Sequence, residues 1–556
     1  MNKIKKLLVS DGKCYNMETA SIKGYTNFLK NNLPLSIAVT ITLFFTYGIK
    51  LIWNNIGHDT ERFIFPETGF YEFFISIGRF GLVLTQKLFF IEQFSPFIYF
   101  FVAFVLIWVF TTSWCYIIAI FNQNTQKDNN LIPFALVFMT MPIWTEQFYF
   151  VFQSPAIAFM ICLCPYIIYL FYKGFLDNEI KKILCALVLL VYMISVYQAI
   201  ISIFCCGVFA CFVFLREHTD YKSKIYYLLC LKIFLSLIFA ILIYKIIHGL
   251  IIPFVFNIQN QNYLTDAWSN KKSVYENLKM NLEFLCRISI GHISIIRKFT
   301  YPVFKFIFGL QYAVNLHHYT DVSIRTFLFA PVSLFFIIRI MYVFKRKIDK
   351  GQKILYALAG LGIVISIVIM QLTLCALQPV RTFFALPFAY AFMFYYLILK
   401  SKKIFSFVVY FLAIITAGYQ AQISAQLQYS DQLRYNEEVR LSYRLDDLIQ
   451  QIQPDNQKLP VVLVGDYQVA SQKNPNYLGS DVIGKPVFRN VGWGNTTTWC
   501  GLHFMQGLGI NYPMPNSEQL SLALNEAIYM PVYPNTGFVR RVEDFIIVRL
   551  SEHNHY

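Results

Sequence analysis

The sequence predicts a polytopic α-helical membrane protein that carries a small, water-exposed α/β domain at its C-terminus. Of its 556 residues, 57% are hydrophobic and only 14% are charged, and the mean hydropathy is +0.50. This balance differs from that of soluble enzymes. Apolar runs of about 20 residues, the length that crosses a bilayer, recur along the chain. Basic residues gather between alternate runs, as in loops that stay in the cytoplasm.

We expect about 11 transmembrane helices from these runs. One run, 182–215, is too long for a single crossing and has Ser195, Tyr197 and Gln198 near its middle, so we divide it there. A single tilted helix is the alternative, and it would change the number of crossings by one. The expected spans are 33–53, 96–121, 131–144, 148–171, 182–196, 198–215, 225–248, 323–343, 353–374, 382–399 and 403–425.

Charge placement favours the divided run and sets the orientation. The segment 1–32 is rich in Lys and lacks the features of a cleaved signal peptide, so we expect it in the cytoplasm with the first span retained as an anchor. Eleven crossings then place the basic segments 173–182, 216–224, 345–353 and 400–403 inside and residues 426–556 outside. That segment holds more acidic than basic residues, although the whole chain has a net charge of +16. Topology accounts for the positive charge, so nucleic acid is not an expected partner.

The chain therefore divides into three parts. We expect a cytoplasmic N-terminal segment over 1–32, a transmembrane domain over 33–425 with outer loops at 54–95 and 249–322, and an extracytoplasmic α/β domain over 426–556. The first outer loop mixes apolar and polar residues over 70–90, as in a helix that lies along the interface. In the last part, leucines recur at helical spacing over 441–452, and strands are expected near 461–464 and 545–548.

The strongest local signal for chemistry is the motif Gly57-His58-Asp59-Thr60-Glu61-Arg62, directly after the first span. In an extended segment, Asp59 and Glu61 point to the same side and can converge on one ligand. Such a pair could hold a divalent cation such as Mg²⁺ or Mn²⁺, or one carboxylate could act as a general base. A solvated acidic loop is the alternative interpretation.

Further polar residues are expected at the same membrane face. Glu146 lies in Pro142-Ile143-Trp144-Thr145-Glu146-Gln147, and Tyr197-Gln198 lies at the outer end of a helical hairpin. Convergence of three polar clusters at one face is what an active site at the outer interface requires. Glu146 could equally be a carboxylate that stabilises the start of a helix.

Several cations run against the topology rule because they lie in or beside outward-facing segments. A guanidinium group there is a natural partner for a phosphate group, and Arg381, close after Gln378-Pro379, is the sharpest case. Side chains that reach ordinary lipid headgroups are the alternative. The residues are Arg79, Arg297, Lys298, Arg325 and Arg381.

The acidic motif, together with Ile77-Gly78-Arg79-Phe80-Gly81-Leu82-Val83-Leu84, resembles the first outer loop of the bacterial Gtr-type glucosyltransferases, which modify O-antigens and other surface polysaccharides. The segments 142–149 and 195–199 resemble that family in the same order, and the resemblance covers roughly 33–400. It implies the GT-C architecture, a location in the bacterial cytoplasmic membrane, and a sugar donor on a polyprenyl phosphate.

The resemblance also implies residue roles. Asp59 and Glu61 would form the acidic motif with Arg79 close by, although His58 stands where some GT-C enzymes have a second acid, which puts the metal requirement in doubt. A lipid phosphate leaves without protonation, so the enzyme needs one base and cations for the phosphate. We expect Asp59 as the base, Glu61 as an acceptor or metal contact, and Arg381 as the phosphate ligand, with Arg79 or Arg297 as substitutes.

The expected function is therefore the transfer of a hexose, glucose by the resemblance, from a polyprenyl-phosphate donor to a surface polysaccharide outside the membrane. A transporter or flippase for a lipid-linked sugar is the alternative. Transporters usually show repeated halves and charges at mid-membrane depth, whereas this sequence has no evident internal repeat and its unusual charges gather at one interface. A polymer-binding protein whose outer domain does the work is a second alternative.

Overall fold

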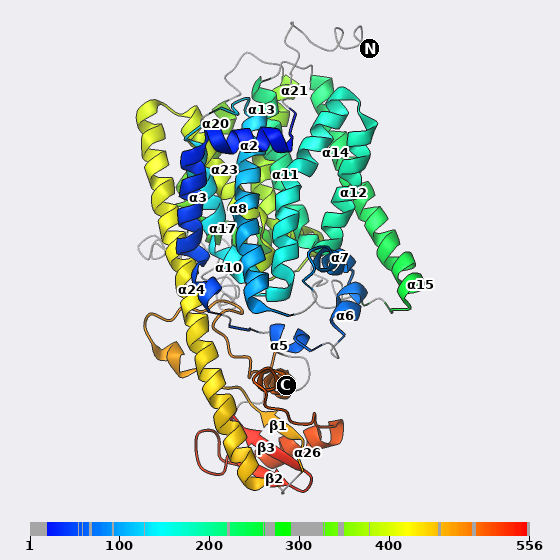
Figure 1. Ribbon diagram of the computed structural model, residues 1–556. Helices are drawn as coiled ribbons and strands as arrows, with labels where there is room; N and C mark the ends of the chain where they lie inside the picture. Colours follow the sequence, from blue (N-terminus) through cyan, green and yellow to red (C-terminus); the bar gives the residue numbers. More distant parts are fainter. Residues whose placement is uncertain are drawn as a thin grey trace.

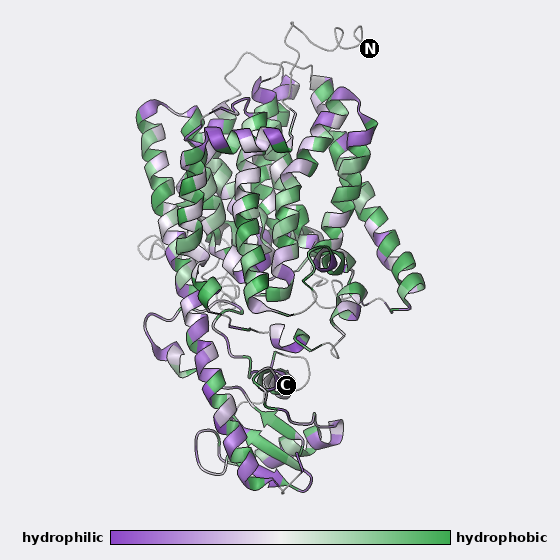
Figure 2. Cartoon of the chain, in the orientation of Figure 1, coloured by the Kyte–Doolittle hydropathy of each residue, from purple (hydrophilic) through white to green (hydrophobic). Residues whose placement is uncertain are grey.

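The computed structural model shows a bundle of apolar helices with a smaller, more hydrophilic domain at one end (Figures 1 and 2). The structure describes residues 19–552, with gaps at 54, 58, 66–68, 92–93, 127, 219–222, 260, 262–272, 291–325, 327, 343–349, 377, 454–456 and 492–495.

The bundle is built from helices that follow the apolar runs of the sequence. Its helices are α3 (Leu33–Tyr47), α4 (Ile49–Ile52), α8 (Pro96–Phe121), α9 (Leu131–Thr140), α10 (Pro142–Phe148), α11 (Ser154–Asp177), α12 (Ile180–Val196), α13 (Ile201–His218), α14 (Ser223–Ile246), α20 (Phe329–Met341), α21 (Lys350–Ile365), α22 (Ile369–Leu374), α23 (Ala385–Lys400) and the first half of α24 (Lys403–Ile452).

Within the described residues, 6 helices are long and apolar enough to cross a membrane, or up to 8 if each of two bent pairs is one span. These findings support a multi-pass membrane protein, while the number 11 stays a prediction. The division of the run 182–215 is confirmed, because α12 ends at Val196 and Tyr197 is extended before the short helix η3 (Gln198–Ile200). Helix α2 (Ile22–Asn31) lies at the end of the bundle opposite the C-terminal sheet (Figure 1).

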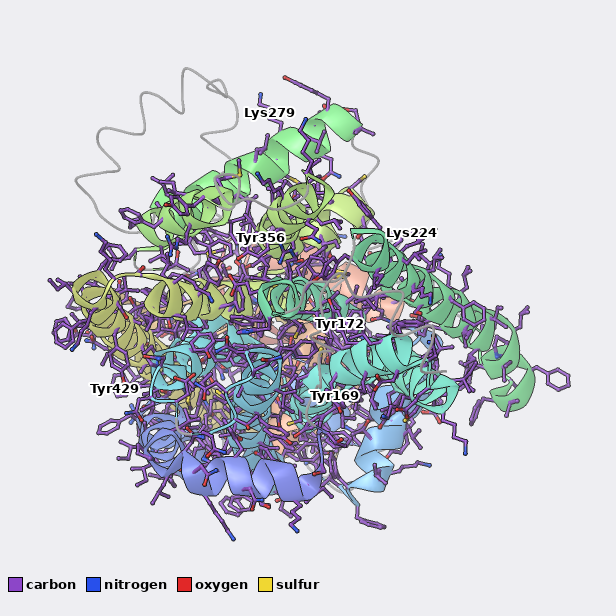
Figure 3. All side chains as sticks on the ribbon, turned by 90° about the horizontal axis from the view of Figure 1, so that it is seen from above. Tyr169, Tyr172, Lys224, Lys279, Tyr356 and Tyr429 are labelled. Atoms are coloured by element: carbon purple, nitrogen blue, oxygen red, sulfur yellow. The ribbon has the colours of Figure 1, made fainter. Side chains whose placement is uncertain are left out.

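Large side chains fill the interior of the bundle (Figure 3). Tyr172 and Tyr356 are buried inside it, whereas Lys224 lies at its edge. Many apolar side chains of α14 face outward and are exposed, Phe234 and Phe239 among them. An apolar outer surface of this kind is suited to lipid and not to water.

Short helices line the end of the bundle that faces the C-terminal domain (Figure 1). The single interfacial helix expected over 70–90 is instead two helices, because Gly78 adopts a φ of +82°, which turns the chain between them. Beyond α14, a π-helix (Ile247–Ile251) leads into a short helix. These helices are α5 (Thr60–Phe63), α6 (Phe70–Ser76), α7 (Phe80–Leu88), the 3-10 helices η2 (Val151–Gln153) and η9 (Val380–Thr382), and α15 (Ile252–Phe256). The longer helix α17 (Val274–Ile290) packs on α20 and α22.

One 50-residue helix, α24, joins the bundle to the C-terminal domain (Figure 1). The expected boundary at 425/426 therefore falls inside a helix. Hydropathy drops there because the helix leaves the apolar layer (Figure 2), but the backbone hydrogen bonds continue. The helix ends at Ile452, and Pro454 follows in the sequence, as is common after helices.

The C-terminal domain holds a three-stranded sheet in the order β1-β3-β2, built from β1 (Val461–Val464), β2 (Val539–Val542) and β3 (Phe545–Arg549). β1 runs parallel to β3, and β2 runs antiparallel to it. Alternate residues of β1 face opposite sides. One side packs on α24 and α25 (Thr496–Gly507), and the other packs on α26 (Ser517–Ala527). Both expected strands are confirmed.

Candidate active site

The acidic loop lies between the bundle and the C-terminal domain (Figure 1). Its backbone is not extended, although an extended backbone is what would align Asp59 and Glu61. Asp59 has a φ of +69°, in the left-handed region, and occupies the N-cap position of the four-residue helix α5, which contains Glu61, without a capping hydrogen bond to its side chain. Asp59 is exposed, whereas the side chain of Glu61 is fully buried. The two carboxyl groups therefore occupy different surroundings, because the helical turn separates side chains that an extended chain would align.

Glu61 is buried against the C-terminal domain, since α5 packs on α25. Burial, together with the negative charge of Asp59, raises the pKa of Glu61 to about 8, although hydrogen bonds from the backbone and the Cys500 thiol act in the opposite direction. Burial likewise raises the pKa of Cys500. Glu61 is therefore mainly protonated at neutral pH, and as a fully buried group it is less accessible to an acceptor hydroxyl than the exposed Asp59.

These surroundings bear on metal binding. Mg²⁺ and Mn²⁺ prefer several oxygen ligands that point at one position. An exposed Asp59 and a fully buried Glu61 lie in different surroundings and do not fit such a shared site. In the part of the chain that the structure describes, no group of three or more His, Cys, Asp and Glu side chains is placed to hold a metal ion.

A second group forms around Arg79, in the turn between α6 and α7. Its guanidinium lies 4.6 Å from the ring centre of Tyr197, and its Nη1 donates to Gln153 Oε1 at 3.0 Å. Gln198 donates to the Tyr244 hydroxyl at 2.7 Å, and that hydroxyl donates to the carbonyl of Gly78 at 3.1 Å. Four separate segments of the chain thus meet at this cluster, as expected for Arg79, Tyr197 and Gln198.

Aromatic rings connect the Arg79 cluster to the acidic loop. Phe63 of α5 packs on Phe74, with ring centres 5.4 Å apart, and Arg79 lies 5.9 Å from the same Phe74 ring. Arg62 lies 4.5 Å from the ring centre of Trp499 on α25. The cations are thus held against aromatic faces, where a ring quadrupole stabilises positive charge.

Glu146 in α10 and Arg381 in η9 lie at the same end of the bundle, because these two helices pack against each other. Ser480 of the C-terminal domain donates to the fully buried carboxylate of Glu146. Arg381, in η9, lies 4.5 Å from the ring centre of Phe150 and is half-buried. Helix α10 packs against η9, so both residues belong to one packed region.

A family model, Glucosyl transferase GtrII, matches residues 48–399, more than half of the chain. The chain belongs to this family. The match covers the acidic loop, the Arg79 cluster and Arg381, but it ends before α24 and the C-terminal domain. Membership of the GtrII family supports glycosyltransferase activity. A comparison with the curated proteins finds no match.

The structure thus gathers most of the expected site residues of this GtrII member at one end of the bundle. Arg297, Lys298, Arg325 and His58 lie outside the described residues. Sequence reasoning did not identify Tyr244 or Cys500, which reach the site only through tertiary packing. It also missed His248, whose ring stacks on Tyr244 with centres 6.1 Å apart. The one available signal was position, since Tyr244 and His248 lie at the outer end of an expected span.

Proposed function

We propose that this protein transfers glucose from a polyprenyl-phosphate donor to a surface polysaccharide on the outer side of the bacterial cytoplasmic membrane. The main support is the placement of an exposed carboxylate, Asp59, at the same end of the bundle as two guanidinium groups, Arg79 and Arg381. This is the combination that a glycosyl transfer from a lipid phosphate requires: one base for the acceptor and cations for the leaving group.

In the proposed reaction, Asp59 accepts the proton of an acceptor hydroxyl while that oxygen forms a bond to the anomeric carbon of the sugar. The bond from the anomeric carbon to the phosphate oxygen breaks, and its electron pair leaves with the lipid phosphate. Glu61 is fully buried against Cys500, so we assign it to support of the loop that carries Asp59 and not to contact with the acceptor. Asp59 is the better base because its carboxylate is exposed to an incoming hydroxyl.

The phosphate is assigned to the arginines. Arg381 lies on the face of Phe150, and Arg79 uses one nitrogen for Gln153. A planar guanidinium offers five donors in a fork that matches phosphate oxygens. Arg381 is the first choice and Arg79 the second.

Transfer of label tests the proposal directly. Purified protein in vesicles would be incubated with a radiolabelled polyprenyl-phosphate glucose and the acceptor polysaccharide. Covalent label in the polysaccharide supports the transferase, whereas label that crosses the bilayer still attached to lipid supports a flippase. A reporter fused to the C-terminus should react only from the outer side, and reaction from the cytoplasm would contradict the proposed orientation.

A further inference from the structure

A fully buried charged network lies in the half of α24 that extends beyond the bundle. Asp431, Arg434 and Glu438 are each at most 1% exposed. Arg434 Nε donates to Asp431 Oδ1 at 2.9 Å, and Arg434 Nη1 donates to Glu438. Buried charges are stable only where their partners are well placed. The three side chains of this network are therefore held in defined positions.

The network reaches the acidic loop. Arg434 Nη2 donates to the backbone carbonyl of Ile56 at 2.8 Å, three residues before Asp59. Asn55 donates to Asp431 and accepts from Lys50 at 2.7 Å. The Ile56 side chain itself belongs to the hydrophobic core of the C-terminal domain. The backbone that leads into Asp59 is therefore held by Asp431 and Arg434 of α24 and by the core of the C-terminal domain, as well as by Lys50.

The same charges also bind the C-terminal domain. Glu438 accepts from the backbone N–H groups of Val487 and Phe488, and Asp431 accepts from the N–H of Gly484 at 3.3 Å. One buried cluster therefore joins three segments that are far apart in sequence: the acidic loop, α24 and the loop 484–488.

We propose that Arg434 is a positioning residue, through which α24 and the C-terminal domain hold Asp59 in its reactive place. The C-terminal domain then forms part of the catalytic unit and is not an independent acceptor-binding module. This inference rests on the proposed role of Asp59 as the base. A displacement of about 1 Å at a reacting group, caused from a distance, can lower a rate by about 10²-fold.

The test compares Arg434→Lys with Glu437→Ala. Lysine keeps the charge that pairs with the two carboxylates but lacks the planar fork that also reaches Ile56. Glu437 is the matched control, because it accepts from the N–H groups of Ala470 and Ser471 at 2.7 and 2.8 Å and so joins the same helix to the same domain at another place.

For Arg434→Lys we expect a kcat about 10²-fold lower, a donor KM within about twofold of the wild type, and faster amide exchange over residues 53–65. Glu437→Ala should change neither kcat nor that exchange. Wild-type kcat and exchange in Arg434→Lys would overturn the inference. An equal loss of kcat in both variants without faster exchange would overturn it too, since general loosening of the domain would then explain the loss.

A second variant covers the case in which Arg434→Lys does not fold. Asn55→Ala removes one attachment of the loop to Asp431 and leaves the contacts of Arg434 intact. It should also speed exchange over 53–65 and lower kcat, and unchanged values would refute the inference that the buried network of Asp431, Arg434 and Glu438 positions Asp59. If the wild type transfers no label at all, the proposed function fails, and the exchange measurements still decide whether Arg434 holds the loop.

Discussion

Replacement of Glu61 by Gln should change how the stability of the protein depends on pH. Glu61 is fully buried in α5 and contacts Cys500 of the C-terminal domain. The titratable and charged groups that act on it are Asp59, Arg62 and Cys500. Gln has nearly the same shape as protonated Glu but cannot ionise, so the variant removes the titration and keeps most of the packing.

The sign and size follow from the pKa of Glu61, which rises from 4.5 to about 8 on folding. Between these values the folded protein holds a proton that the unfolded chain has lost, so the free energy of unfolding falls as pH rises. The contribution of Glu61 to the free energy of unfolding is fully present below about pH 4.5 and is lost by about pH 8. At 1.36 kcal/mol per pKa unit, the loss is on the order of 5 kcal/mol and is an upper bound.

Thermal unfolding of the purified protein in detergent, from pH 5 to pH 9, measures this effect. The wild type should lose Tm steadily up to about pH 8, and Glu61→Gln should show a clearly flatter profile. Because neutral Glu61 is the proposed working form, the variant should also keep most of its transfer activity near pH 7. Identical pH profiles for the two proteins would refute the raised pKa, and a strong loss of transfer would move the base from Asp59 to Glu61.

Substitutions at three further positions, Asp59, Arg381 and Gly57, test the proposed site. Asp59→Asn should lower transfer by about 10²-fold or more, the usual contribution of a general base, while size-exclusion profiles and donor binding stay unchanged; near-normal transfer would contradict its role. Arg381→Ala should raise the donor KM with little change in Tm, and Arg381→Lys should restore it only in part; normal donor kinetics would move the phosphate to Arg79. Gly57→Ala should lower stability by about 1–3 kcal/mol, because its Cβ would overlap the Tyr149 ring, and Tyr149→Ala should restore part of the loss in the double variant.

The apolar helices of the bundle could be predicted from the sequence, because they depend on local composition. Hydrophobic runs of bilayer length gave the helices, and polar residues inside one run gave the break before Gln198. Hydropathy shows where the apolar layer ends but not where a helix ends. The sequence therefore predicts a span that ends at residue 425 and a separate helix over 441–452, whereas α24 continues as one helix to Ile452.

The site was predicted only in part, because its residues meet through contacts between distant segments. The sequence predicts Arg79 and Tyr197 as separate site residues. Their contact depends on the packing of α7 against α12, which the sequence does not show. The extended conformation that would align Asp59 and Glu61 is not present, because residues 60–63 form the helix α5, which packs on α25. Nothing near Asp59 in the sequence points to Arg434.

Asp59 combines two unfavourable features on one exposed residue. Its φ of +69° lies in the left-handed region, which costs a residue with a Cβ about 1–2 kcal/mol and costs glycine nothing. Its charge also raises the pKa of the buried Glu61. Because the side chain is exposed, its packing contributes little free energy of folding to offset either cost. Strain at a position that glycine would relieve is typical of functional sites, and it favours Asp59 as the group that takes the acceptor proton.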